Sequence, residues 1–141
     1  MTPSPRLLLI AAALPFLAGC VNDSASYMID GDRKHAITVK RAQSWFWNDA
    51  LDVTVVAARD DECVGGLDLG SLKRDDELVL HQAPDEYEEP IYILSVDGDS
   101  YAISTRSCRV QRFEAPPAEP GPEVGRFQET DGKLQFLPAG G

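Results

Sequence analysis

The sequence predicts an all-β fold, a small antiparallel sandwich or barrel of about six or seven strands with one disulfide. The first observation is that its apolar segments alternate with period two instead of helical spacing. The second is that turn residues separate these segments about every 8–14 residues. The third is that no stretch carries the pattern of an amphipathic helix of normal length.

The size and charge of the chain argue against a multidomain protein and against a nucleic-acid-binding protein. A chain of 141 residues has room for one domain with terminal segments. Its formal net charge of −10 and pI near 4.5 argue against nucleic acid as a partner, because such binding needs Lys and Arg to displace counterions from phosphates. Apolar residues make up 43% of the chain, which is enough to form a core.

The predicted strands lie in a β-domain that spans residues 27–113. In residues 51–57 the apolar side chains share one face and Asp52 and Thr54 share the other, as in a half-buried strand. Residues 90–96 are apolar on both faces and predict a central strand. In chain order, the predicted strands are residues 27–29, 35–41, 51–57, 77–81, 90–96 and 100–105, with Asp-Gly-Asp turns at 30–32 and 97–99.

A proline-rich linker and a hairpin follow this domain. Residues 114–125 carry four prolines and predict an extended linker. In residues 126–141, Asp-Gly is a strong two-residue turn signal and sets a register in which Phe127 faces Phe136. Since a lone hairpin is marginal in water, we expect it to dock on the domain, to become ordered on a partner, or to fray.

Residues 1–19 have the layout of a signal peptide. Arg6 precedes ten residues, 7–16, which form an apolar run of the length typical of secretory peptides and too short to cross a bilayer. Leu-Ala-Gly-Cys follows at residues 17–20. In combination with the preceding segment, this motif resembles the lipobox of bacterial lipoproteins. The alternative is an ordinary secretory peptide followed by a chance cysteine.

The resemblance implies that Cys20 receives a diacylglyceryl group, that the chain is cut between Gly19 and Cys20, and that the new amino terminus is acylated. Residues 20–26 would then be an acylated tether to the membrane. In Gram-negative sorting, Asp after the acylated cysteine commonly retains a lipoprotein at the inner membrane, and Val21 stands there instead. The resemblance therefore favours an outer-membrane protein that faces the periplasm over an inner-membrane protein.

Two cysteines remain when Cys20 is assigned to lipid. Cys63 and Cys108 form an even pair, and in an oxidising compartment the simplest use of such a pair is a disulfide. The bond would close a loop of about 46 residues and stabilise the fold by about 4 kcal/mol in the chain-entropy model. A redox or metal-binding pair is the alternative, but the chain has no Cys-x-x-Cys and two histidines cannot obviously complete a zinc shell.

No pattern in the sequence predicts an enzyme, a metal or another cofactor. Acidic clusters at 60–62, 75–77 and 85–89 fall between predicted strands, where charge keeps loops solvated. His35 and His81 lie inside predicted strands, and His81, beside Gln82, is expected to be a polar residue at the end of a strand. The chain also lacks the Gly-x-Ser-x-Gly motif of a nucleophile elbow.

The largest aromatic cluster is the segment from Trp45 to Trp47. In an extended segment both indoles share a face, which suits stacking on a sugar or anchoring a protein contact. Core packing is the default for two tryptophans in a small domain, although Asn48 and Asp49 predict a turn that would expose part of the segment. The candidate binding surface therefore comprises Trp45, Trp47 and the hairpin residues Phe127 and Phe136.

We expect a non-enzymatic accessory or scaffold protein of a periplasmic or outer-membrane assembly, with an envelope protein as partner. A periplasmic module that binds a small ligand or glycan is the alternative. The mature region also resembles short β-rich proteobacterial lipoproteins, on Tyr-Met-Ile-Asp-Gly at residues 27–31 and the two later cysteines, Cys63 and Cys108. That family is functionally uncharacterised, so the resemblance implies placement and a disulfide without supplying an active site.

Overall fold

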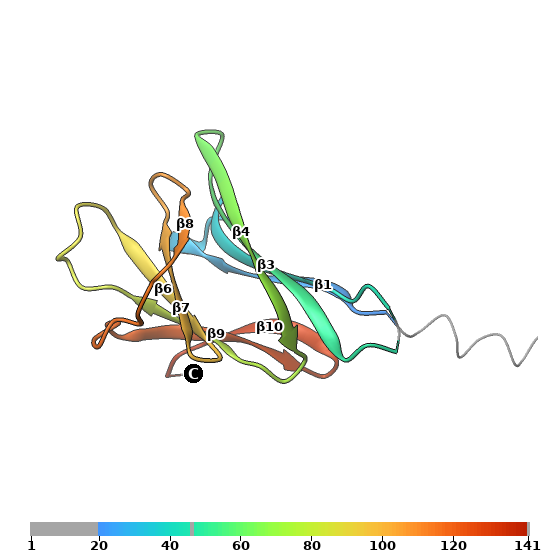
Figure 1. Cartoon of the computed structure of the whole chain (residues 1–141). Helices are drawn as coiled ribbons and strands as arrows, with labels where there is room; N and C mark the ends of the chain where they lie inside the picture. The colour runs from blue at the N-terminus through green and yellow to red at the C-terminus, as the bar shows by residue number, and fades with distance from the viewer. Residues whose placement is uncertain (1–19, 46, 141) are drawn as a thin grey trace, which may run out of the picture.

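The computed structural model describes residues 20–45 and 47–140, which form a sandwich of two antiparallel sheets (Figure 1). The predicted signal peptide, residues 1–19, lies outside the described residues. The first sheet has the order β1-β2-β3-β4 and the second has the order β10-β9-β5-β6-β7-β8. The all-β sandwich is confirmed, and the sheets do not close into a barrel.

The described residues contain ten strands instead of the six or seven predicted. A short 3₁₀ turn, η3 (Ile29–Gly31), separates β1 from β2. The strands are β1 (Asn22–Met28), β2 (His35–Ala42), β3 (Ala50–Arg59), β4 (Cys63–Lys73), β5 (Leu78–Gln82), β6 (Ile91–Val96), β7 (Asp99–Ser104), β8 (Val110–Arg112), β9 (Glu123–Thr130) and β10 (Lys133–Pro138).

The amino-acid composition of two strands does not predict a strand. β1 begins at Asn22, inside the segment 20–26 that was expected to be a tether, because its backbone pairs with β2 along its whole length. β4 contains three glycines and pairs with β3, although glycine weakens strand propensity. In both strands alternate residues are partly buried, so the pairing partner and not the local composition determines the structure.

The C-terminal hairpin is an integral part of the second sheet. β9 and β10 pair in the predicted register, with Phe127 opposite Phe136, around a turn at Asp131 and Gly132. Both turn residues have the positive φ of a two-residue hairpin turn, 54° and 80°. β9 also pairs with β5 and begins at Glu123, within the predicted linker. Docking on the chain's own domain is therefore the arrangement that forms.

Residues 113–122 carry the chain from the edge strand β8 to β9, which lies on the far side of β5. Phe113 N donates a hydrogen bond to Ser100 O at one end, and Gln82 N donates to Pro122 O at the other. Extended chain covers about 3.3–3.6 Å per residue, so this segment is long enough to pass β7, β6 and β5. The predicted proline-rich linker thus spans a sheet instead of separating two units.

The hydrophobic core lies between the two sheets and draws on both. Strands β2 and β3 contribute alternating residues from one side, and β5, β6, β7 and β9 contribute from the other. The fully buried aliphatic and aromatic side chains of this core include Ile37, Val39, Leu51, Val53, Val55, Leu80, Leu94, Ile103 and Phe127. The predicted strand 90–96 is central, since β6 has neighbours on both sides.

The predicted disulfide between Cys63 and Cys108 is present and links the two sheets. It joins the start of β4 to the loop between β7 and β8, with Cα atoms 5.8 Å apart. The two segments approach so closely that a Cβ on Gly65 would lie 2.0 Å from the carbonyl oxygen of Cys108. Only glycine fits at that position, and the bond therefore closes one edge of the sandwich.

Replacing Cys63 and Cys108 together by serine should lower the free energy of unfolding by about 4 kcal/mol, because the unfolded chain regains the freedom of a 46-residue loop. Urea denaturation of the variant and the native chain measures this difference. Cys20→Ser is the matched control and should leave stability unchanged, because Cys20 is exposed and makes no disulfide. Equal stability of the double variant and the control would contradict a stabilising role for the bond.

Candidate functional site

Cys20 is exposed at one end of the sandwich, directly before the first strand. Val21 is already attached to the domain: Gln43 N donates to Val21 O at 2.8 Å, and Val21 N donates to Gln43 Oε1 at 3.1 Å. Val21 also packs against the core. The pairing of β1 with β2 thus places Cys20 beside the loop of residues 43–49, which connects β2 to β3.

This β2–β3 loop presents both tryptophans to solvent. Trp45 is 58% exposed and Trp47 is 65% exposed, and their rings stack with centroids 5.1 Å apart and planes 20° apart. The default expectation of core packing was wrong, whereas the turn predicted from Asn48 and Asp49 forms. Asn48 N donates to Trp45 O at 3.0 Å, and Gln43 Nε2 donates to Asn48 O.

The hairpin aromatics do not belong to this exposed surface. Phe127 is 0% exposed, and Phe136 is partly buried against the core. Phe136 contacts Tyr27 and Phe127, with ring centroids 5.1 Å and 5.0 Å apart. The assignment of Phe127 to a binding surface was wrong, because β9 carries this side chain into the core between the sheets.

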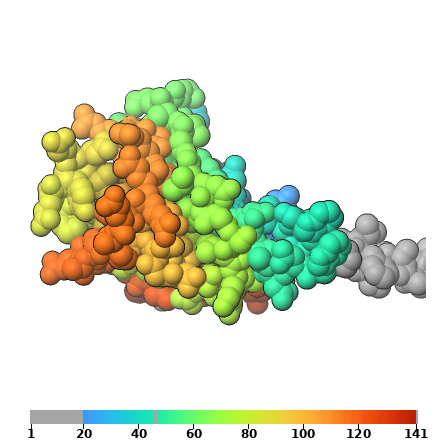
Figure 2. Space-filling view, viewed as in Figure 1, coloured from blue at the N-terminus to red at the C-terminus, as the bar shows by residue number. Residues whose placement is uncertain are grey.

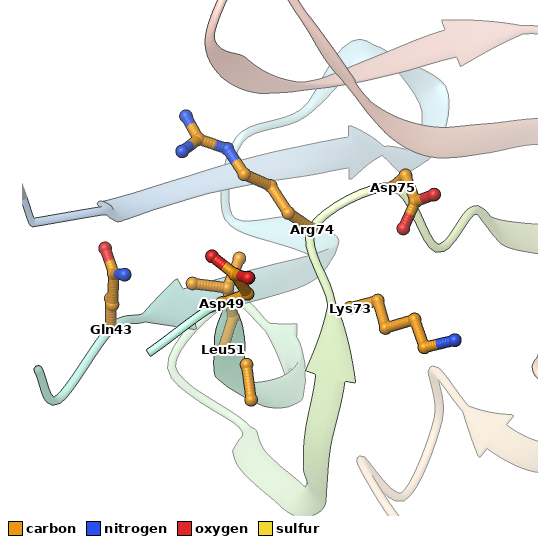
Figure 3. Close-up of a pocket in the computed structure, with 7 residues that line it drawn as sticks. Gln43, Asp49, Leu51, Lys73, Arg74 and Asp75 are labelled. Carbon is orange, nitrogen blue, oxygen red and sulfur yellow. The ribbon is translucent and has the colours of Figure 1, made fainter. Parts of the chain in front are cut away.

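Two hollows open at the end of the sandwich where Cys20 lies, called here the Cys20 end. The first, of about 440 Å³, has Leu51 at its floor and charged residues around it (Figure 3). It is lined by Gln43, Asp49, Ala50, Leu51, Lys73, Arg74 and Asp75. The second, of about 450 Å³, is lined by Cys20, Val21, Asn22, Asp23, Arg74, Gly132 and Lys133. Arg74 is common to both hollows, so the chain start, the β2–β3 loop and the turns after β4 and β9 meet at this end.

A partly buried ion network centred on Arg41 joins strands of both sheets at this end. Arg41, only 4% exposed, donates to both carboxylate oxygens of Asp23, at 2.8 Å and 2.7 Å, and to Glu129 at 3.2 Å. Glu129 also accepts from Arg74 at 2.6 Å. Asp23 accepts a further hydrogen bond from the backbone of Leu134 at 2.9 Å. The network therefore joins β1 and β2 of the first sheet to β9 and β10 of the second.

Pairing between opposite charges favours the ionised forms of Asp23 and Arg41. The hydrogen bond from Arg41 lowers the pKa of Asp23 below its ordinary value of 3.8, against the opposing effect of burial. The same contact raises the pKa of Arg41. A carboxyl whose pKa is lower in the folded state than in the unfolded state stabilises the fold at any pH above its unfolded-state pKa. This contribution is lost as the pH falls through its folded-state pKa.

Residues with catalytic potential are dispersed. His35 lies in β2, and the Nδ1 of His81 in β5 is 3.1 Å from Gly121 O. In the part of the chain that the structure describes, no hydrogen bond joins either histidine to a serine, threonine or cysteine. Within residues 20–45 and 47–140, no group of three His, Cys, Asp or Glu side chains is placed to hold a metal ion. The acidic clusters lie in the turns and loops after β3, β4 and β5, as predicted.

Replacing Arg41 by alanine should lower the free energy of unfolding by about 3 kcal/mol, because Asp23 and Glu129 would lose their shared cation in a partly buried site. Urea denaturation at neutral pH measures the loss. Arg112→Ala is the matched control, since Arg112 pairs with Asp99 on the surface and its removal should cost little. A loss no larger than that of the control would contradict the role of the network.

The pH dependence of stability should carry the signature of Asp23. Asp23→Asn should be less stable than the native chain at neutral pH, and the difference should narrow as the pH falls from 3.8 through the lower folded pKa of Asp23. Urea denaturation as a function of pH measures it, with Asp99→Asn as the control for an exposed carboxyl. A difference that stays constant down to strongly acidic pH would contradict the assignment.

No protein-family model matches the chain, and no curated protein or solved structure is significantly similar to it. In the described residues, no helix is long and apolar enough to cross a membrane. The function of the chain is therefore inferred from its own residues and geometry.

Proposed function

We propose that the protein is a lipid-anchored lipoprotein of the bacterial envelope, acylated on Cys20, whose sandwich is a non-enzymatic accessory or scaffold domain. The observation that carries the proposal is the position of Leu-Ala-Gly-Cys, which ends two residues before β1. A cut between Gly19 and Cys20 removes nothing from the sandwich. The exposed thiol of Cys20 is accessible to an acylating enzyme.

The other features of the chain agree with an extracytoplasmic protein. The disulfide between Cys63 and Cys108 is typical of oxidising compartments such as the periplasm. The net charge of −10 does not attract the protein to anionic headgroups, so lipid on Cys20 supplies the attachment. Val21 after the cysteine favours the outer membrane, with the sandwich facing the periplasm.

The distribution of the reactive side chains supports the non-enzymatic part of the proposal. The histidines and the acidic clusters lie on separate strands and turns, without the mutual contacts of a nucleophile, a base and an orienting acid. This distribution favours an accessory or scaffold role in an envelope assembly.

A small-ligand module is the second candidate, and one observation favours it. The hollow beside Leu51 has a volume of about 440 Å³, within the range of small-molecule sites. Lys73, Arg74 and Asp49 would give a ligand charged partners around an apolar floor.

Cys20→Ser tests the proposed function. In the native protein we expect mass spectrometry to find an amino-terminal peptide that begins at acylated Cys20, and a labelled fatty acid to enter the protein in cells. The variant should carry no label and should leave the membrane fraction. The Cys63→Ser, Cys108→Ser double variant is the control and should keep the label. An unmodified Cys20 in the native protein would overturn the anchor.

In-cell crosslinking of the same two proteins tests the accessory role. We expect one reproducible envelope protein to be captured by the native chain and lost with Cys20→Ser, because the anchor concentrates the domain at the membrane. Absence of any partner, together with stabilisation of the domain by a periplasmic small molecule, would favour the second candidate instead.

A further inference from the structure

We propose that Trp45 and Trp47 insert into the headgroup region of the bilayer beside the acylated Cys20, so that the β2–β3 loop is a second membrane contact. The inference rests on the proposed acylation of Cys20. It assigns the exposed indole pair to a lipid surface instead of a glycan or a protein partner.

The first step of the argument is the shortness of the tether. Val21 is hydrogen-bonded to Gln43 and packed against the core, and β1 begins at Asn22. Since one residue spans at most about 3.6 Å, the lipid on Cys20 leaves the domain no slack to stand away from the membrane. The end of the sandwich that carries Cys20 must therefore lie at the bilayer surface.

The second step is the position of the indoles at that end. β1 and β2 pair from Asn22 opposite Ala42, so the residues that precede β1 and those that follow β2 lie next to one another. Trp45 follows Ala42 by three residues, and Cys20 precedes Asn22 by two. The β2–β3 loop, teal in Figure 2, projects from the body at the same end as the start of β1.

The third step is that hydrogen bonds hold described residues of the loop on both sides of position 46. Gln43 bonds both to Val21 and to Asn48 O, Asn48 N donates to Trp45 O, and Ser44 Oγ donates to Asp52 at 2.9 Å. The loop is thus tied to the residue next to Cys20 and to β3. Insertion of the indoles would require little ordering of the loop.

The fourth step is the chemistry of the loop. Indole combines a large apolar ring with an N–H donor and is enriched at membrane–water interfaces. Residues 43–49 include only one charged side chain, Asp49, so little charge opposes insertion. The two rings stack on each other, which occupies the faces that a sugar ring would need to lie between them.

The test uses tryptophan emission, because Trp45 and Trp47 are the only tryptophans of the chain. The acylated protein, which begins at Cys20, is reconstituted into vesicles of phosphatidylethanolamine and phosphatidylglycerol, with or without brominated lipid. Compared with Cys20→Ser in solution, we expect a shift of the emission to shorter wavelength, strong quenching by brominated lipid, and a severalfold smaller quenching constant for aqueous iodide.

The matched control places an indole at the opposite end. The loop of residues 83–90 follows β5, which runs away from the Cys20 end, and it lies far from the β2–β3 loop in Figure 1. A chain with Trp45→Phe, Trp47→Phe and Tyr87→Trp carries one exposed indole in that loop. Its emission should remain accessible to iodide and insensitive to brominated lipid, which separates insertion from mere attachment.

The outcomes distinguish this inference from the proposed function. Acylated, vesicle-bound protein whose tryptophans stay as accessible to iodide as in Cys20→Ser would overturn insertion and leave the lipid anchor intact. Quenching by cell-wall glycan fragments in place of lipid would also overturn it. If mass spectrometry of the same sample shows Cys20 unmodified, the anchor itself fails, and the inference fails with it.

Discussion

The ion network around Arg41 is the constraint on which the arrangement of the two sheets depends. β1 and β10 come from opposite ends of the chain and belong to different sheets, yet Asp23 binds both Arg41 and the backbone of Leu134. A buried guanidinium is costly to desolvate, and two carboxylates with fixed geometry offset that cost. Because the partners lie on four strands and the turn after β4, the network forms only when the whole sandwich is assembled.

The same dependence explains why the C-terminal hairpin is ordered. Alone it would be marginal, but β9 pairs with β5 at four positions and carries Phe127 into the core. Glu129 on β9 then forms ion pairs with both Arg41 and Arg74. The proline-rich segment before it has a structural task, since it must cross the sheet from β8 to β9. β9, which the sequence places in a separate C-terminal hairpin, is thus an interior strand of the second sheet.

Residue patterns in the sequence correctly predicted the features that depend on neighbouring residues, such as turns. Asp-Gly pairs specify hairpin turns through positive φ, so the turn and register around Gly132 and the return at Gly98 were predicted correctly. β4 was missed because its glycines carry little strand signal, and its pairing with β3 decides its structure. The pairing of β9 with β5 was missed for a related reason, since no local pattern specifies a partner so far away in the chain.

At the candidate site, too, a local turn signal was more informative than overall composition. The exposed tryptophans also affect where a partner of an accessory domain could bind. Composition suggested that Trp45 and Trp47 pack in the core, whereas the turn at Asn48 and Asp49 was the signal for their exposure. Indoles embedded in headgroups are not available to a protein partner, so membrane insertion and partner binding compete for one surface. If the Cys20 end rests on the bilayer, a partner must approach other parts of the sandwich. β4 is such a surface, because it is an edge strand of the first sheet.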